Sequence, residues 1–310
     1  MTDMIVNFFK QSKPIVFVVL LFLLSLIFTV EALQVITFPL NWATIGLVVT
    51  KYLLLVLCYI MFDYALKHFE IQKGHSFGGL FFILMSSFIM PEILDSYIIF
   101  GYVLFLIGLL RLLNVVNSDY PTMTIFEAVF FFFFASLFYQ PFLFVLILVL
   151  VVTLVFTSPH WRYFLVPLLA ISSVIVLLEM FNIFWYNEPL MVDSFWPQWE
   201  FKIYTFSSKP QLFSFLIWVL STLIFVYQAF KVIQKRALYH QKMATSFLYL
   251  ALLAFMSSWF SISNLEGLWM MSTIPISIYL GDFIFRLRKK FWKEVLLYAF
   301  IAFVVVFNLL

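Results

Sequence analysis

Long apolar runs recur along the whole chain, and this feature restricts the fold more than any other. The runs hold roughly 16 to 22 apolar residues each, and a helix needs about 20 of them to cross the hydrocarbon core of a bilayer. Hydrophobic residues make up 65% of the 310 positions and charged residues only 11%, too few to cover a soluble domain. We therefore predict an all-α, polytopic transmembrane helical bundle, a single domain over residues 1–310 whose solvent is the lipid bilayer.

Eleven membrane spans are predicted. They cover residues 14–31, 43–65, 76–90, 94–113, 125–140, 141–156, 163–184, 211–230, 244–262, 267–285 and 292–310. The fifth and sixth are separated because one helix over 125–156 would be about 48 Å long, against about 30 Å of hydrocarbon. Pro141 would also interrupt its hydrogen bonds. No small-residue cleavage site precedes Glu31, so the first span is expected to be an uncleaved one.

Basic residues fall mostly on one side of this topology. That side holds Lys10, Lys13, Lys67, Lys73, Arg111, Arg162, Lys231, Lys235, Arg236, Lys242, Arg286, Arg288, Lys289, Lys290 and Lys293. By the positive-inside rule this side, with the N-terminus, is cytoplasmic. The net charge of +3 reflects topology, so it predicts no nucleic-acid partner.

Several carboxylates gather on the opposite, outer side. The segment "SSFIMPEILDSY" places Glu92 and Asp95 beside Pro91, and Glu31 ends the preceding outward span. If the fourth span begins near Pro91, both of its acids lie on the first helical turn, where the helix dipole favours anions. Lys51, inside the second span, could pair with them. The cluster predicts either an acidic pocket with one buried cation or a helix cap with a salt bridge.

Other polar and aromatic residues lie near the same outer side. Glu179 lies close to the outer end of the seventh span, and the outer loop 185–210 contains Trp196, Trp199, Lys202 and Lys209. The tryptophans are expected to form an interfacial belt. The members of this belt are Trp42, Trp185, Trp196, Trp199, Trp259 and Trp269. Trp196 and Trp199 could instead stack on a sugar.

The chain lacks the motifs that are typical of ATP-driven pumps and of soluble-type hydrolases. The chain has no P-loop, dinucleotide-binding glycine fingerprint, H-E-x-x-H sequence or serine elbow. The single cysteine, Cys58, permits neither an internal disulfide nor a cysteine-based metal site. Asp282, near the end of a span, is expected to be solvated. Gly101 and Gly108 share a helix face and predict close helix packing.

Three stretches carry a family resemblance. They are "PEILDSYIIFGYVLFLIGLLRLLNV", "IFEAVFFFFFASLFYQPFLFVL" and "SPHWRYFLVPLLAISSVIVLL". They resemble an uncharacterised family of multipass inner-membrane proteins of Bacteroidota. This likeness runs over most of the chain and implies a bacterial inner-membrane location.

The same stretches resemble, more distantly, the C superfamily of membrane-embedded glycosyltransferases, which use polyprenyl-phosphate sugars at the outer face. The resemblance implies such a module over residues 1–184, followed by the outer loop 185–210 and C-terminal spans over 211–310. Glu31 would take the acidic position of the first outer loop, and Glu92 or Asp95 that of the second. The first outer loop here is short and lacks an Asp-x-Asp sequence.

Three functions follow as hypotheses. In a transferase, Glu31, Glu92 and Asp95 would be catalytic, one of them as general base and another as ligand of a divalent metal ion. Residues expected to bind the lipid-linked substrate are Lys51, Glu179, Lys202, Lys209, Trp196 and Trp199. The alternatives are a non-enzymatic subunit with membrane-protein partners in a cell-envelope complex, and a lipid or solute transporter.

Overall fold

The computed structural model describes residues 4–11, 13–35, 41–72, 74–156, 161–186, 209–235, 237–259 and 264–309. Every regular element in these ranges is a helix, as predicted. The α-helices are α1 (Met4–Phe9), α2 (Pro14–Val35), α3 (Trp42–His68), α4 (Phe77–Ser86), α5 (Met90–Asp95), α6 (Ile98–Leu113), α7 (Pro121–Ser136), α8 (Val145–Phe156), α9 (Trp161–Tyr186), α10 (Lys209–Lys235), α11 (Leu238–Ser258), α12 (Asn264–Arg286) and α13 (Lys290–Leu309). Three short 3-10 helices join them: η1 (Ser87–Ile89), η2 (Asn114–Asn117) and η3 (Gln140–Phe144).

Six segments of the described chain are long and apolar enough to cross a membrane. They are Pro14–Gln34, Trp42–His68, Phe77–Asp95, Trp161–Trp185, Gln211–Gln234 and Leu268–Arg286. Shorter apolar helices such as α6 and α7 have 16 residues each, a length of about 24 Å, less than a full hydrocarbon core. The structure thus supports a multipass helical bundle, while the count of eleven spans and their orientation stay predictions.

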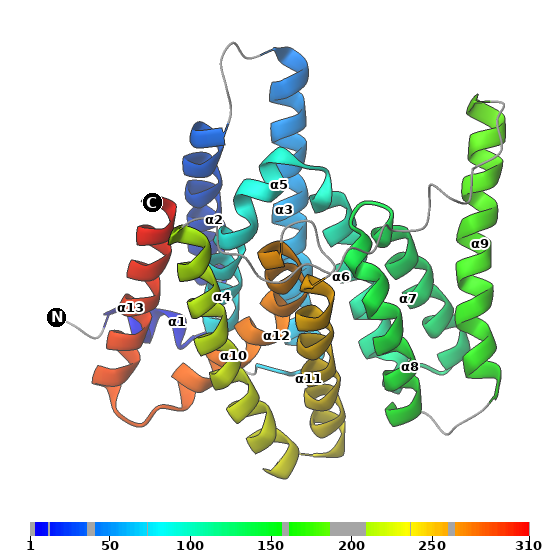
Figure 1. Ribbon diagram of the computed structural model, residues 1–310. Coiled ribbons are helices and arrows are strands. Elements are labelled where there is room, and N and C mark those ends of the chain that lie inside the picture. The colour runs from blue at the N-terminus through cyan, green and yellow to red at the C-terminus, as the bar shows by residue number, and fades with distance from the viewer. Residues whose placement is uncertain are drawn as a thin grey trace.

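Helices α4 and α12 form the interior of the bundle, and α9 lies at its edge (Figure 1). In the apolar 18-residue stretches of the spans that contain α4 and α12, 89% of the residues are buried, against 17% for the corresponding stretch of α9. A Cβ atom at Gly281 would lie 2.6 Å from the backbone nitrogen of Gly78 and 3.0 Å from its Cα. The close contact between α12 and α4 therefore requires glycine at position 281.

Gln72 joins the same two helices from the segment that precedes α4. Its Nε2 donates a hydrogen bond to the Ile278 carbonyl at 2.5 Å, and its Oε1 accepts one from the Gly78 N–H at 3.1 Å. The amide is buried. It satisfies one of the unpaired backbone N–H groups at the start of α4 while holding α12 in place.

Two glycines on α6 allow α7 to approach closely, as predicted. A Cβ at Gly101 would lie 3.0 Å from the Ala135 carbonyl oxygen, and one at Gly108 would lie 3.1 Å from that of Ala128. The predicted break near Pro141 is also present, because α7 ends at Ser136 and the 3-10 turn η3 leads into α8.

Two tryptophan–serine hydrogen bonds connect α10 and α12. Trp218 Nε1 donates to Ser272 Oγ, and Trp269 Nε1 donates to Ser214 Oγ, both at 2.8 Å. Trp269 is fully buried and stacks on Phe88, with ring centroids 4.6 Å apart. The prediction that Trp269 belongs to an interfacial belt is therefore wrong, because a serine hydroxyl in the core satisfies its N–H.

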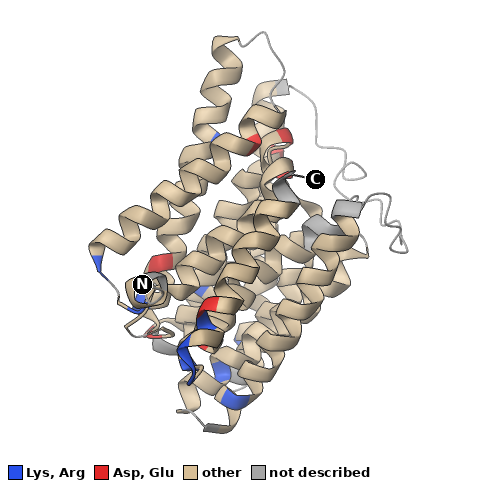
Figure 2. Ribbon diagram, turned by 90° about the vertical axis from the view of Figure 1, so that its left-hand side faces the viewer, with Lys and Arg blue, Asp and Glu red and all other residues tan. Residues whose placement is uncertain are grey.

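Charged residues are unevenly distributed along the bundle (Figure 2). Lys and Arg gather toward the end where α3, α6 and α12 finish, and the last turns of these helices carry Lys67, Arg111 and Arg286. We call this the basic end. The opposite end, where α2 finishes and α5 lies, is called the α5 end. Cations in a last helical turn complement the helix dipole.

Candidate functional site

Lys51 is buried at the α5 end, with 2% of its surface exposed. Its ammonium donates a hydrogen bond to the backbone carbonyl of Leu94, at 2.5 Å. It also lies 5.7 Å from the ring centroid of Tyr97 and interacts electrostatically with Asp95. Leu94 is in the last turn of α5, where carbonyls lack partners within the helix, so Lys51 caps α5 and its charge complements the helix dipole.

The two acids of "SSFIMPEILDSY" do not share the first turn of a long span, so this prediction is wrong. Glu92 lies in the first turn of α5, after Pro91, whereas Asp95 is the last residue of that short helix. Ser96 ends the helix because its backbone is extended, with φ −117° and ψ 177°, and its hydroxyl donates to the Glu92 carbonyl at 2.7 Å. Helix α6 begins only at Ile98. Glu92 is half-buried and Asp95 is exposed.

Glu31 is the most deeply buried acid of the group. It lies on α2, one turn before the end of this helix, and 3% of its surface is exposed. Its carboxylate forms no hydrogen bond or ion pair with another described residue. Helix α2 packs against both α3 and α5, which carry Lys51 and Glu92. Glu31, Lys51, Glu92 and Asp95 therefore lie on three helices in mutual contact, and we call them the acid–lysine cluster.

Two of the remaining predicted substrate-binding residues, Glu179 and Lys209, are on helices other than these three. Glu179 is on α9, which packs on α7 at the far edge of the bundle from α2 (Figure 1). Lys202, Trp196 and Trp199 lie outside the described residues, and Lys209 is the first residue of α10. Among the described residues, Lys51 and Asp95 interact, and Glu31 and Glu92 lie on helices that contact theirs.

A second polar group, at the basic end, was missed by the sequence analysis. Asp282, on α12, was expected to be solvated but is 7% exposed. Its Oδ2 accepts a hydrogen bond from Arg286 at 2.7 Å, and its Oδ1 lies 3.5 Å from His75 Nε2. The Asp–Arg spacing of four residues within one helix was a visible signal for the first contact. No sequence signal indicated His75, which precedes α4.

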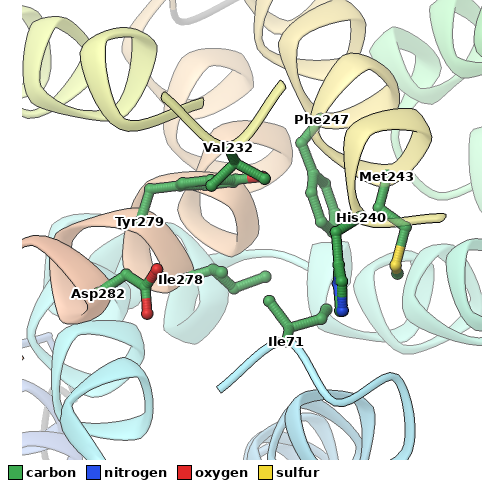
Figure 3. Close-up of a pocket in the computed structure, with 8 residues that line it drawn as sticks. All are labelled: Ile71, Val232, His240, Met243, Phe247, Ile278, Tyr279 and Asp282. Atoms are coloured by element: carbon green, nitrogen blue, oxygen red, sulfur yellow. The ribbon is translucent and has the colours of Figure 1, made fainter. Parts of the chain in front are cut away.

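A small cavity adjoins Asp282 (Figure 3). Asp282 and His240 point toward it from opposite sides, and its walls are mostly apolar. Its lining consists of Ile71, Val232, His240, Met243, Phe247, Ile278, Tyr279 and Asp282. The volume is about 20 Å³, enough for about one water molecule. A substrate therefore has no room in it.

The described part of the chain holds no group of three or more His, Cys, Asp or Glu side chains that could bind a metal ion. Glu92 and Asp95 come from one short helix and differ in burial. No chemical step is therefore assigned to a metal.

Comparisons with known proteins found no family model, curated protein or solved structure that matches this chain. The resemblances carried by its sequence therefore remain predictions.

Proposed function

We propose that this protein is a membrane-embedded transferase of the bacterial inner membrane, acting at the outer face on a glycan linked to polyprenyl phosphate. In this proposal the N-terminus is cytoplasmic, eleven spans cross the bilayer, and the α5 end faces outward. The observation that carries the proposal is Glu31, a carboxylate buried within the candidate span Pro14–Gln34 and without a partner among the described residues. An acid in this position is costly and is a functional candidate by default.

The acid–lysine cluster supplies the groups that a glycosyl transfer needs. Glu31 would accept the proton of the acceptor hydroxyl as that oxygen bonds to the sugar carbon, while the polyprenyl phosphate leaves with the bonding electrons. Lys51 has three N–H donors and uses one of them on Leu94, so two remain for phosphate oxygens. Glu92 and Asp95 would orient the acceptor through hydrogen bonds.

Charge-neutral variants test the catalytic role. We expect Glu31→Gln and Asp95→Asn to lose function in a strain that depends on this protein, at unchanged protein level, with accumulation of the lipid-linked donor by mass spectrometry. Glu127→Gln, an acid that pairs with Arg111 at the basic end, should behave as wild type in the same strain. Normal function of the Glu31→Gln, Glu92→Gln, Asp95→Asn triple variant would overturn the transferase proposal.

Reporter fusions test the orientation separately. A fusion after Leu310 should report the periplasmic side if eleven spans follow a cytoplasmic N-terminus. A cytoplasmic signal would require an even number of spans.

A second candidate function is a non-enzymatic subunit of a membrane complex. The hydrogen bond from Lys51 to the Leu94 carbonyl favours it, because a buried cation that caps a helix serves stability. In that case the triple acid variant keeps its function, whereas Lys51→Met lowers the amount of folded protein.

A further inference from the structure

A larger cavity lies at the basic end, between the last turns of α10 and α12. Its volume is about 360 Å³. The lining consists of Tyr227, Gln228, Lys231, Phe283, Arg286 and Leu287. Two cationic side chains thus face an open cavity whose remaining walls are aromatic, aliphatic and amide groups.

The two cations retain unused hydrogen-bond donors. Lys231 lies 4.2 Å from the ring centroid of Tyr227 and forms no ion pair with a described residue. Arg286 gives one guanidinium nitrogen to Asp282, and its other N–H groups remain available. Asp282 offsets part of the charge of Arg286, so the unpaired cation of the cavity is Lys231.

Gln228 adds a buried hydrogen-bond acceptor to the lining of the cavity. The side chain is 3% exposed, and its Oε1 has no hydrogen-bond partner among the described residues. A buried amide oxygen without a partner is unfavourable. A ligand with hydroxyl groups beside an anion would satisfy both the amide and the cations.

We propose that this cavity binds a phosphate group, that of an anionic phospholipid headgroup such as phosphatidylglycerol. The candidate span on α10 ends at Gln234, one turn beyond Lys231, so a bilayer around this span would have its headgroups at the level of the cavity. Basic pockets between membrane helices bind such headgroups. Exposed apolar residues of α10, Leu216, Leu220 and Leu223, offer a surface for the acyl chains.

The test uses the full-length protein in neutral detergent. Phosphatidylglycerol, phosphatidylcholine and inorganic phosphate are added separately. Native mass spectrometry measures the bound lipid, and a thermal melt measures the midpoint of unfolding. We expect phosphatidylglycerol to bind and to raise the midpoint, whereas phosphatidylcholine does neither. Stabilisation by inorganic phosphate that competes with phosphatidylglycerol would retain the phosphate site but overturn the lipid as its source.

Matched variants locate the binding. Lys231→Gln and Arg286→Gln should each weaken phosphatidylglycerol binding about fivefold. Lys289→Gln removes one charge from an exposed residue outside the lining and should bind as wild type. Lys231→Gln is decisive because it breaks no ion pair with a described residue. Equal affinities of Lys231→Gln and Lys289→Gln, or no preference for phosphatidylglycerol over phosphatidylcholine, would overturn the proposal.

Discussion

The two ends of the bundle both bury charged residues, but they satisfy them differently. At the basic end, the Asp282 carboxylate has two partners, the Arg286 guanidinium and the His75 imidazole. At the α5 end, the Glu31 carboxylate is as deeply buried and has none among the described residues. Removing the partner of a buried charge is costly, whereas a buried acid that has no partner can be neutralised at little cost and is a candidate for a functional role.

The largest effect is expected at the basic end. Asp282→Leu leaves the buried His75 and the partly exposed Arg286 without their partner and should lower the free energy of unfolding by about 2 to 3 kcal/mol, less than the full cost of a completely buried pair because water reaches Arg286. Thermal unfolding in detergent measures the loss. Asp63→Leu is the matched control, since Asp63 and Lys67 have the same four-residue spacing but Lys67 is largely exposed. It should cost less than about 1 kcal/mol, and equal losses would contradict the comparison.

Packing differs between the two ends as well. Gly281→Ala pushes a methyl group against the Gly78 backbone, which cannot move aside, and should cost about 2 kcal/mol. Gly46→Ala, in α3 at the α5 end, meets no atom within 4 Å and should stabilise the protein by up to about 1 kcal/mol through helix propensity. Thermal unfolding of both variants compares them directly. A neutral Gly281→Ala would show that α4 and α12 are less closely packed.

A smaller effect is expected for Lys51→Met. The Leu94 carbonyl loses its donor, so stability should fall by about 1 kcal/mol. Amide hydrogen exchange in α5 should become faster, because the cap of this helix is gone. Unchanged exchange in α5 would mean that the hydrogen bond contributes nothing to holding it.

The smallest effect is expected for Glu31→Gln. No partner among the described residues is lost and a buried charge is removed, so stability should change by less than about 0.5 kcal/mol or rise. Thermal unfolding checks this beside Asp282→Leu. A loss above about 1 kcal/mol would identify Glu31 as a structural acid and remove the contrast between the two ends.

Local features of the sequence predicted the local features of the fold. The apolar runs predicted the helices, and Pro141 predicted the break between α7 and α8. Gly101 and Gly108 predicted the close contact of α6 with α7. Each of these depends on residues within one segment or on one helix face. Lys51 was identified because a charge inside an apolar run is conspicuous.

Contacts between distant segments could not be predicted. Helix α4 is buried on all sides, so its sequence does not indicate which face meets α12. Asp282 and Trp269 resemble residues of a membrane edge until their partners His75 and Ser214 are placed beside them. The early end of α5 lies at Ser96, whose backbone is extended, and a serine is too common in sequences to mark a helix end.

The pairing of α4 with α12 also sets an order of events during synthesis. Gln72 and Ile278, which join the two helices, are 206 residues apart in the chain. At about 5 to 20 residues per second, α4 leaves the ribosome about 10 to 40 s before its partner. Ser86 and Ser87 hydrogen-bond to carbonyls of their own helical turns, so their hydroxyls need no partner during this delay. Helix α4 can therefore remain in contact with lipid during this delay. The contact between α4 and α12 in the interior of the bundle forms only after α12, in the last quarter of the chain, has been synthesised.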